Sequence, residues 1–128
     1  MNLDQFQNLE RIGSTMYVGF NDGIERLVFP KLKEIEGALV VEANPKLKEI
    51  AFPSLVKVAK YVHIHDNRSL EKLDLPKLAT IGAELSMLDN AKLVHVVVAS
   101  KTAPASTTAV QIKNNANETY VNLFVRAP

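Results

Sequence analysis

The chain has 128 residues, of which 47% are hydrophobic and 23% are charged, and this is the composition of one globular domain rather than of a disordered segment. A formal net charge of +1 leaves no global field for collecting nucleic acid or an anionic membrane, and the absence of cysteine excludes disulfides, thiolate metal sites and cysteine nucleophiles. No apolar run approaches the ~20 residues that a membrane-spanning helix needs.

The first residues predict a partial coil and lack the pattern of a secretory signal. Residues 1–8 lack the basic start and apolar stretch of a secretory signal, so we expect a cytoplasmic protein or a fragment of a surface protein. Residues 6–12 match residues 29–35, which indicates that the chain begins part-way round a repeated coil. We expect Leu3 and Phe6 to fold over its open end.

An internal repeat of 23 residues follows and covers residues 9–98 without a gap. Its step is marked by columns of equivalent residues, among them Pro30, Pro53 and Pro76, and Asn21, Asn44, Asn67 and Asn90. A repeat of this length indicates a solenoid, in which each coil buries its apolar side only against its neighbours.

Each coil carries two short stretches with strand periodicity. Apolar residues lie two apart in Leu39/Val41 and again in Ile50/Phe52, and proline ends the second stretch. Equal coil lengths predict equivalent strands stacked in parallel register about 4.8 Å apart. We therefore predict an all-β fold, a parallel β-helix of about four regular coils in which seven apolar positions per coil point inward.

Polar columns support the same register. The asparagines at 21, 44, 67 and 90 follow the first strand of each coil, where their amides can turn inward and bond backbone groups of their own and the next coil. We predict an asparagine ladder at this turn. On the outside, three columns alternate in sign as parallel pairing requires: Arg26/Glu49/Lys72, Glu25/Lys48/Glu71 and Arg11/Glu34/Lys57.

After Val98 the repeat decays. Residues 99–108 predict a loop, Val110 and Ile112 resume strand alternation, residues 114–117 predict a turn, and residues 120–125 predict a last strand. We expect residues 99–128 to form an irregular C-terminal coil and cap within a single β-solenoid domain of residues 1–128. Because the N-terminal end has no dedicated cap, we also expect a homodimer.

The repeat pattern Phe-Pro-x-Leu-x-x-Ile-x-Gly-x-Leu-x-Val-x-x-Asn-x-x-Leu-x-x-Ile resembles the receptor L-domain family over residues 6–98. The resemblance implies a right-handed β-helix related to leucine-rich repeats, a fold that supplies ligand-binding ectodomains of insulin and growth-factor receptors. The repeat is similar also to the leucine-rich units of BspA-type bacterial surface proteins. Both families bind through variable surface positions, so the resemblance carries over no functional residue.

The outward face of the first sheet is the candidate binding surface. Aromatic and histidine side chains gather there on an otherwise polar solenoid, which favours contact with a protein or a glycan, although exposed strands also use such residues for cross-strand packing. The candidate binding residues are Tyr17, Val40, Glu42, Tyr61, His63, His65 and Leu88.

Two histidines on this face raise the question of a metal. His63 and His65 lie on one side of a strand, at a spacing that can chelate zinc, and Glu42 in the neighbouring coil is a third candidate ligand. The same pair also fits an exposed strand without any metal, and our expectation is no metal and no cofactor.

The chain shows no motif that predicts catalysis. It has no glycine-rich phosphate loop and no serine in a nucleophile elbow, and its carboxylates are scattered over turns and exposed columns. We expect a non-enzymatic protein-binding or scaffolding module that presents a β-sheet face to a protein partner, without nucleic-acid binding or membrane insertion. The alternatives are a glycan-binding or polysaccharide-active β-helix protein and a self-assembling structural protein.

Overall fold

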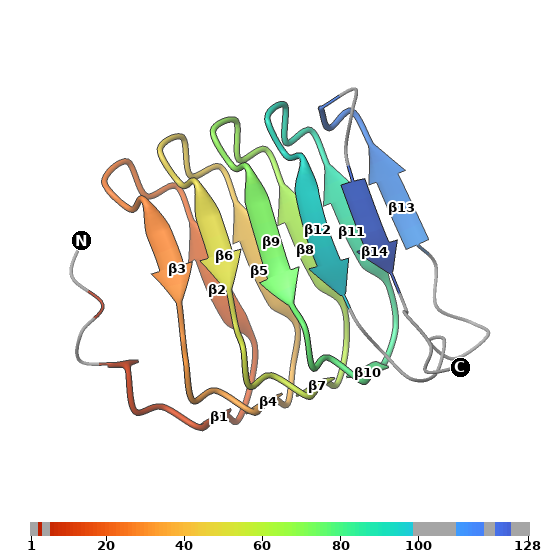
Figure 1. The fold of residues 1–128 in the computed structure, drawn as a ribbon. Coiled ribbons are helices and arrows are strands. Elements are labelled where there is room, and N and C mark those ends of the chain that lie inside the picture. Colours follow the sequence, from red (N-terminus) through yellow and green to blue (C-terminus); the bar gives the residue numbers. More distant parts are fainter. Residues whose placement is uncertain (1–2, 4–5, 99–109, 117–119, 124–128) are drawn as a thin grey trace.

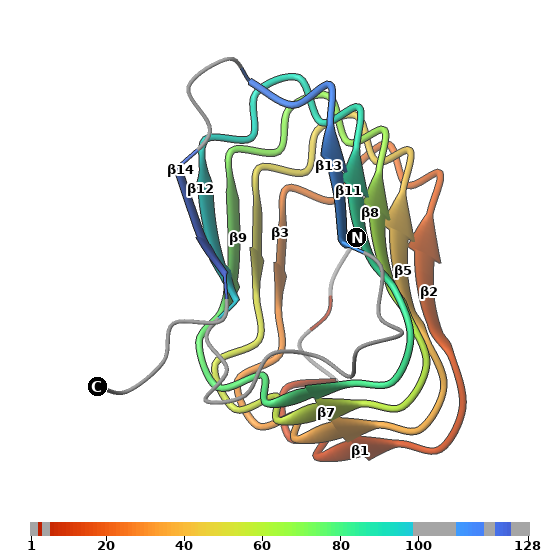
Figure 2. The same cartoon turned by 90° about the vertical axis from the view of Figure 1, so that its right-hand side faces the viewer.

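The computed structural model describes residue 3 and residues 6–98, 110–116 and 120–123. They form a β-solenoid of about 4 turns, with equivalent positions about 23 residues apart and every sheet parallel. Figures 1 and 2 show the coils stacked along one axis, with sheets on three sides of a common interior. This confirms the predicted all-β, parallel solenoid. No helix in these ranges is long and apolar enough to cross a membrane.

Two of the three sheets have five strands each. The first, which we call the β8 sheet, contains β2 (Met16–Gly19), β5 (Leu39–Glu42), β8 (Val62–His65), β11 (Leu85–Leu88) and β13 (Val110–Lys113). The second, the β9 sheet, contains β3 (Arg26–Val28), β6 (Glu49–Ala51), β9 (Lys72–Leu75), β12 (His95–Val98) and β14 (Tyr120–Leu123). These sheets correspond to the two predicted strand stretches of each coil.

A third, four-stranded sheet has no counterpart in the predicted strands. It contains β1 (Arg11–Ile12), β4 (Glu34–Ile35), β7 (Lys57–Val58) and β10 (Thr80–Ile81). Each of these strands is 2 residues long, so it contains no alternation from which a strand could be predicted. The cross-section is therefore three-sided (Figure 2).

The interior is filled by the predicted apolar positions. In the second coil all seven are 0% exposed, namely Leu32, Ile35, Leu39, Val41, Leu47, Ile50 and Phe52. Burying each such side chain contributes about 1.5–3 kcal/mol before the entropy of ordering is subtracted. The ring of Phe29 lies between those of Phe6 and Phe52, with centroid distances of 6.3 and 5.5 Å, which places the partial N-terminal coil in line with the regular ones.

The asparagine ladder is present and buried. Asn44 donates from Nδ2 to the carbonyl oxygen of Val18 at 3.0 Å and to Oδ1 of Asn67 at 3.1 Å. Asn67 repeats this geometry with Val41 and Asn90. The backbone partners belong to the preceding coil, not to the asparagine's own and the next coil as predicted: Nδ2 reaches a carbonyl oxygen there and Oδ1 accepts from a backbone N–H there, while the bond to the next coil goes to a side chain. Asn44, Asn67 and Asn90 are 0% exposed, so the ladder satisfies polar groups that no water reaches.

The ladder has a fifth member that the repeat did not indicate. Asn115 accepts at Oδ1 from the backbone N–H and Nδ2 of Asn90, at 3.2 and 3.1 Å. It lies 25 residues after Asn90, so it does not fall on the regular spacing that marks the other asparagines. β13 and β14 confirm the two strands predicted near the C-terminus, whereas the predicted loop over residues 99–108 and the end of the last strand lie outside the described residues.

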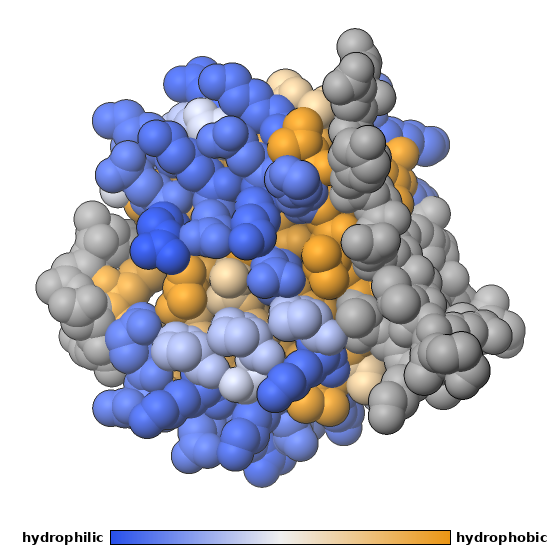
Figure 3. All heavy atoms as spheres, viewed as in Figure 1, coloured by the Kyte–Doolittle hydropathy of each residue, from blue (hydrophilic) through white to orange (hydrophobic). Residues whose placement is uncertain are grey.

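The predicted charge columns are also in register. Arg26, Glu49 and Lys72 stand opposite one another, and Glu49 contacts Arg26 at 2.9 Å and Lys72 at 3.8 Å. Lys48 approaches Glu25 at 4.0 Å in a second column. Figure 3 shows the β9 sheet side of the molecule, where hydrophilic residues flank a narrow apolar band. Exposed pairs of this kind each contribute little stability, so they are evidence of the register rather than its cause.

We predict that Asn67→Ala lowers the free energy of unfolding by at least about 3 kcal/mol, because several buried donors and acceptors lose their partners. The Asn67 side chain takes part in four hydrogen bonds. Asn21→Ala is the matched control: among the described residues its side chain makes one bond, to Asn44, so the expected loss is about 1 kcal/mol. Urea unfolding of both variants measures the difference, and equal losses would contradict a buried ladder.

Candidate functional site

The candidate surface is the outer side of the β8 sheet. We call it the β8 face, defined by Tyr17, Val40, Glu42, Tyr61, His63, His65 and Leu88. Parallel pairing places Tyr17, Val40 and His63 in one column across β2, β5 and β8. Glu42 stands opposite His65 in a second column. The structure thus brings the predicted residues onto one continuous surface.

Three rings line up along β8. The centroids of Tyr61 and His63 are 4.2 Å apart with an interplanar angle of 38°, and those of His63 and His65 are 4.8 Å apart at 17°. Alternate residues of a strand point to the same side, which explains why these positions meet. All three residues are half-buried. The line of rings therefore forms a packed ridge on the sheet.

The ridge is held on one flank by β11 and the residue before it. Nε2 of His63 lies 3.0 Å from Oε1 of Glu84, and Nε2 of His65 lies 2.8 Å from Oγ of Ser86. Ser86 is only 1% exposed although it is on the outer side of its strand. Glu84 and Ser86 were outside the predicted binding set. Glu84 and Ser86 follow Tyr61 and His63 by one coil step, and this spacing in the sequence could have placed them beside the ridge.

Tyr17 and Glu42 form a polar contact on the other flank. Tyr17 donates a short hydrogen bond to Oε1 of Glu42 in the next coil. A Cβ at Gly19 would lie 2.6 Å from the Tyr17 ring, so only glycine lets the ring lie along the strand. The hydrogen bond to Glu42 raises the pKa of Tyr17 above its ordinary value. Tyr17 is 52% exposed and is the most accessible ring of the β8 face.

The surroundings of His65 disfavour its charged form. Burial lowers the pKa of His65 below its ordinary value, and the neighbouring His63 lowers it further, while Asp66, Glu42 and Glu84 act in the opposite direction. The stability that accompanies this shift is present above the unfolded pKa of 6.5 and is lost as the pH falls through the folded value. Near neutral pH the β8 face therefore presents His65 as a neutral ring.

The described residues contain no group of three or more His, Asp or Glu side chains arranged to hold a metal ion. The candidate set of His63, His65 and Glu42 is not brought together as ligands. His63 and His65 stack ring against ring, their Nε2 atoms contact Glu84 and Ser86, and Glu42 accepts from Tyr17.

Comparisons with protein-family models, with curated proteins and with solved structures find no match for this chain. The parallel solenoid stands on the structure itself. The resemblance to receptor L domains and leucine-rich repeats stays a prediction from the repeat pattern.

We predict that His63→Ala raises the pKa of His65 toward its ordinary value, because the variant removes a neighbouring positive charge and uncovers one side of the ring. An NMR titration of the histidine ring protons measures the shift. His95→Ala is the matched control, since His95 lies on the β9 sheet, and it should leave the titration of His65 unchanged. An unchanged or lower value in His63→Ala would contradict the described stack.

Proposed function

We propose that this protein is a non-enzymatic binding or scaffolding module that contacts a protein partner through the β8 face. The observation that carries the proposal is the ridge of Tyr61, His63 and His65, whose rings pack at centroid distances of 4.2 and 4.8 Å, the first pair tilted and the second stacked. Rings already held in one arrangement lose little conformational freedom when they bind, so a preformed ridge is suited to recognition.

The partner surface follows from what lies around the ridge. Val40 and Leu88 add half-buried apolar area beside the rings, and the carboxylates of Glu42 and Glu84 border it. Aromatic anchors surrounded by polar groups are typical of protein interfaces. A partner with an apolar centre and flanking arginine or lysine groups would complement this arrangement.

The polar groups of the ridge help to hold its shape, which supports a binding role. Nε2 of His63 and Nε2 of His65 each contact a neighbouring side chain, and the Glu42 carboxylate accepts from Tyr17. These contacts orient the side chains within the surface.

A glycan ligand is the second candidate. It is favoured by Tyr17, whose ring is 52% exposed and whose hydroxyl is paired with Glu42, because sugars pack on accessible aromatic rings and bond carboxylates. Such a site would centre on Tyr17 rather than on the half-buried ridge. The two candidates therefore respond to different substitutions.

The test compares two double variants in affinity capture from the source cell, followed by titration of each captured protein. In the Tyr61→Ala/His63→Ala variant we expect the partner's affinity to fall about 100-fold or more, as for an interface hot spot. Lys72→Ala/Asp74→Ala is the matched control on the outer side of β9, and it should retain the partner.

A glycan array with the same proteins and with Tyr17→Ala separates the candidates. Saturable glycan binding that is lost in Tyr17→Ala and kept in the ridge variant would replace the protein-partner proposal. Identical captured proteins and affinities for wild type, ridge variant and control would overturn the β8 face as a binding surface.

A further inference from the structure

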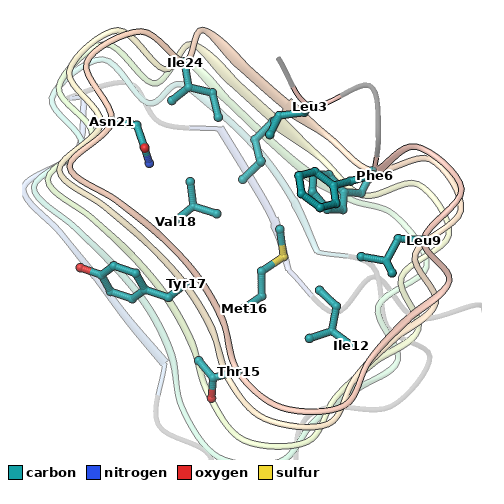
Figure 4. Close-up of a pocket in the computed structure, with 12 residues that line it drawn as sticks. Leu3, Phe6, Leu9, Ile12, Thr15, Met16, Tyr17, Val18, Asn21 and Ile24 are labelled. Atoms are coloured by element: carbon teal, nitrogen blue, oxygen red, sulfur yellow. The ribbon is translucent and has the colours of Figure 1, made fainter. Parts of the chain in front are cut away.

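The first coil leaves an open hollow at the N-terminal end of the solenoid. Its volume is about 370 Å³ and its wall consists mostly of apolar side chains of the first coil. In Figure 4, Val18 points into the hollow and Tyr17 points away from it. Ile12 and Val18 are only partly buried, whereas their equivalents Ile35 and Val41 in the second coil are 0% exposed. The first coil therefore leaves exposed part of the apolar interior surface that each later coil buries against its neighbours.

Large apolar side chains gather at the same end. Among the described residues the exposed large hydrophobic side chains are Phe6 at 39%, Tyr17 at 52%, Phe20 at 73% and Val56 at 43%; Phe6 lies in the partial N-terminal coil and Phe20 in the first coil, beside Tyr17 of the β8 face. Phe20 also has a φ of 56°, a backbone conformation that bulky residues rarely adopt. The equivalent residues Ala43, Asp66 and Asp89 have a similar positive φ, so the conformation belongs to the turn of each coil, and it is the exposure of a phenylalanine there that marks this end as a contact surface.

The first coil also has unpaired strand edges. β1, β2 and β3 each stand at the end of their sheet. Along the β8 sheet, N–H groups of one coil donate to carbonyl groups of the next, as Met16 does to Ala38 at 2.9 Å. Alternate residues of a parallel strand face opposite neighbours, so the N–H and carbonyl groups of Tyr17 and Gly19 face the open end. They form a ready template for another parallel strand.

The asparagine ladder gives the two ends opposite polarity. Oδ1 of Asn44 accepts two hydrogen bonds from Asn21, whereas Oδ1 of Asn21 accepts none from any described residue. At the other end the backbone N–H of Asn90 donates to Asn115, and the same step directs the N–H of Asn115 toward a following coil. The N-terminal end therefore offers an acceptor where the C-terminal coil offers a donor.

We propose that the N-terminal end of one copy of this chain stacks on the C-terminal coil of a second copy, head to tail. The β13 edge of one copy then pairs in parallel with the β2 edge of the next, and the N–H of Asn115 donates to Oδ1 of Asn21. Ile112, an inward residue of the last coil that packs partly buried against the core, covers the hollow.

Head-to-tail stacking preserves features that a two-fold pairing of N-terminal ends would lose. A two-fold axis cannot continue the two five-stranded parallel sheets, and it brings two Asn21 acceptors together. A heterologous contact of this kind repeats from copy to copy and forms open chains rather than closed dimers. The proposal concerns an end of the solenoid and does not require that the ridge of Tyr61, His63 and His65 binds a partner.

Sedimentation velocity over a range of concentrations tests the proposal. We expect the average mass of the wild type to rise with concentration beyond a dimer. Ile12→Lys places a charge in the hollow, and Ile112→Lys places one on the opposite end, so each variant alone should be monomeric. Mixed at equal amounts, they should form a one-to-one dimer through the two ends that remain intact. Circular dichroism and thermal unfolding check that both variants fold.

Phe20→Asp provides a second N-terminal variant that the fold tolerates, because Asp66 and Asp89 occupy the equivalent positions with the same positive φ. Compared with the wild type, its dissociation constant for self-association should be about tenfold or more higher. A wild type that stays monomeric at all concentrations would overturn the proposal. So would an Ile112→Lys variant that still dimerises, since that result identifies pairing of two N-terminal ends.

Discussion

The stacking of buried asparagine amides is the constraint on which the rest of this structure depends. Each amide in the interior of the ladder satisfies backbone groups of one coil and the side chain of the next, and Asn44, Asn67 and Asn90 have no access to water. A coil whose asparagine did not return to this position would leave these groups unpaired at a cost of about 1–3 kcal/mol each, and the 25-residue step to Asn115 shows that a longer coil is accommodated when its asparagine does return. The ladder thereby holds every coil in register, and with it the outer columns that form the β8 face.

The sequence predicted those features that recur at every coil. The inward residues, the ladder and the charge columns follow from periodicity alone, because each coil repeats the same packing problem. The third sheet was missed because its strands have 2 residues each. Asn115 was missed because it lies off the 23-residue step, at a distance of 25 residues from Asn90.

The candidate site was predictable in its membership but not in its contacts. Alternation along β8 places Tyr61, His63 and His65 on the outer side, and equal coils place Glu42 beside His65. Ring stacking and the bond from His65 to Ser86 depend on side-chain rotamers, which a repeat pattern does not encode. For the same reason, the spacing of His63 and His65 raised the question of a metal, although none was expected, and did not indicate that the two rings stack on each other. Function in this solenoid is therefore sought where side chains depart from the repeat: on the β8 face and at the open end.

Hydrogen exchange of the asparagine side-chain amides tests the central claim most directly. In NMR spectra, the Nδ2 protons of Asn44, Asn67 and Asn90 should exchange only when the whole solenoid unfolds, because they are buried and bonded between coils. The amides of the exposed Asn8 and Asn114 provide the reference for rapid exchange. Exchange of the three ladder amides at the rate of that reference would contradict a buried, bonded ladder and the register that depends on it.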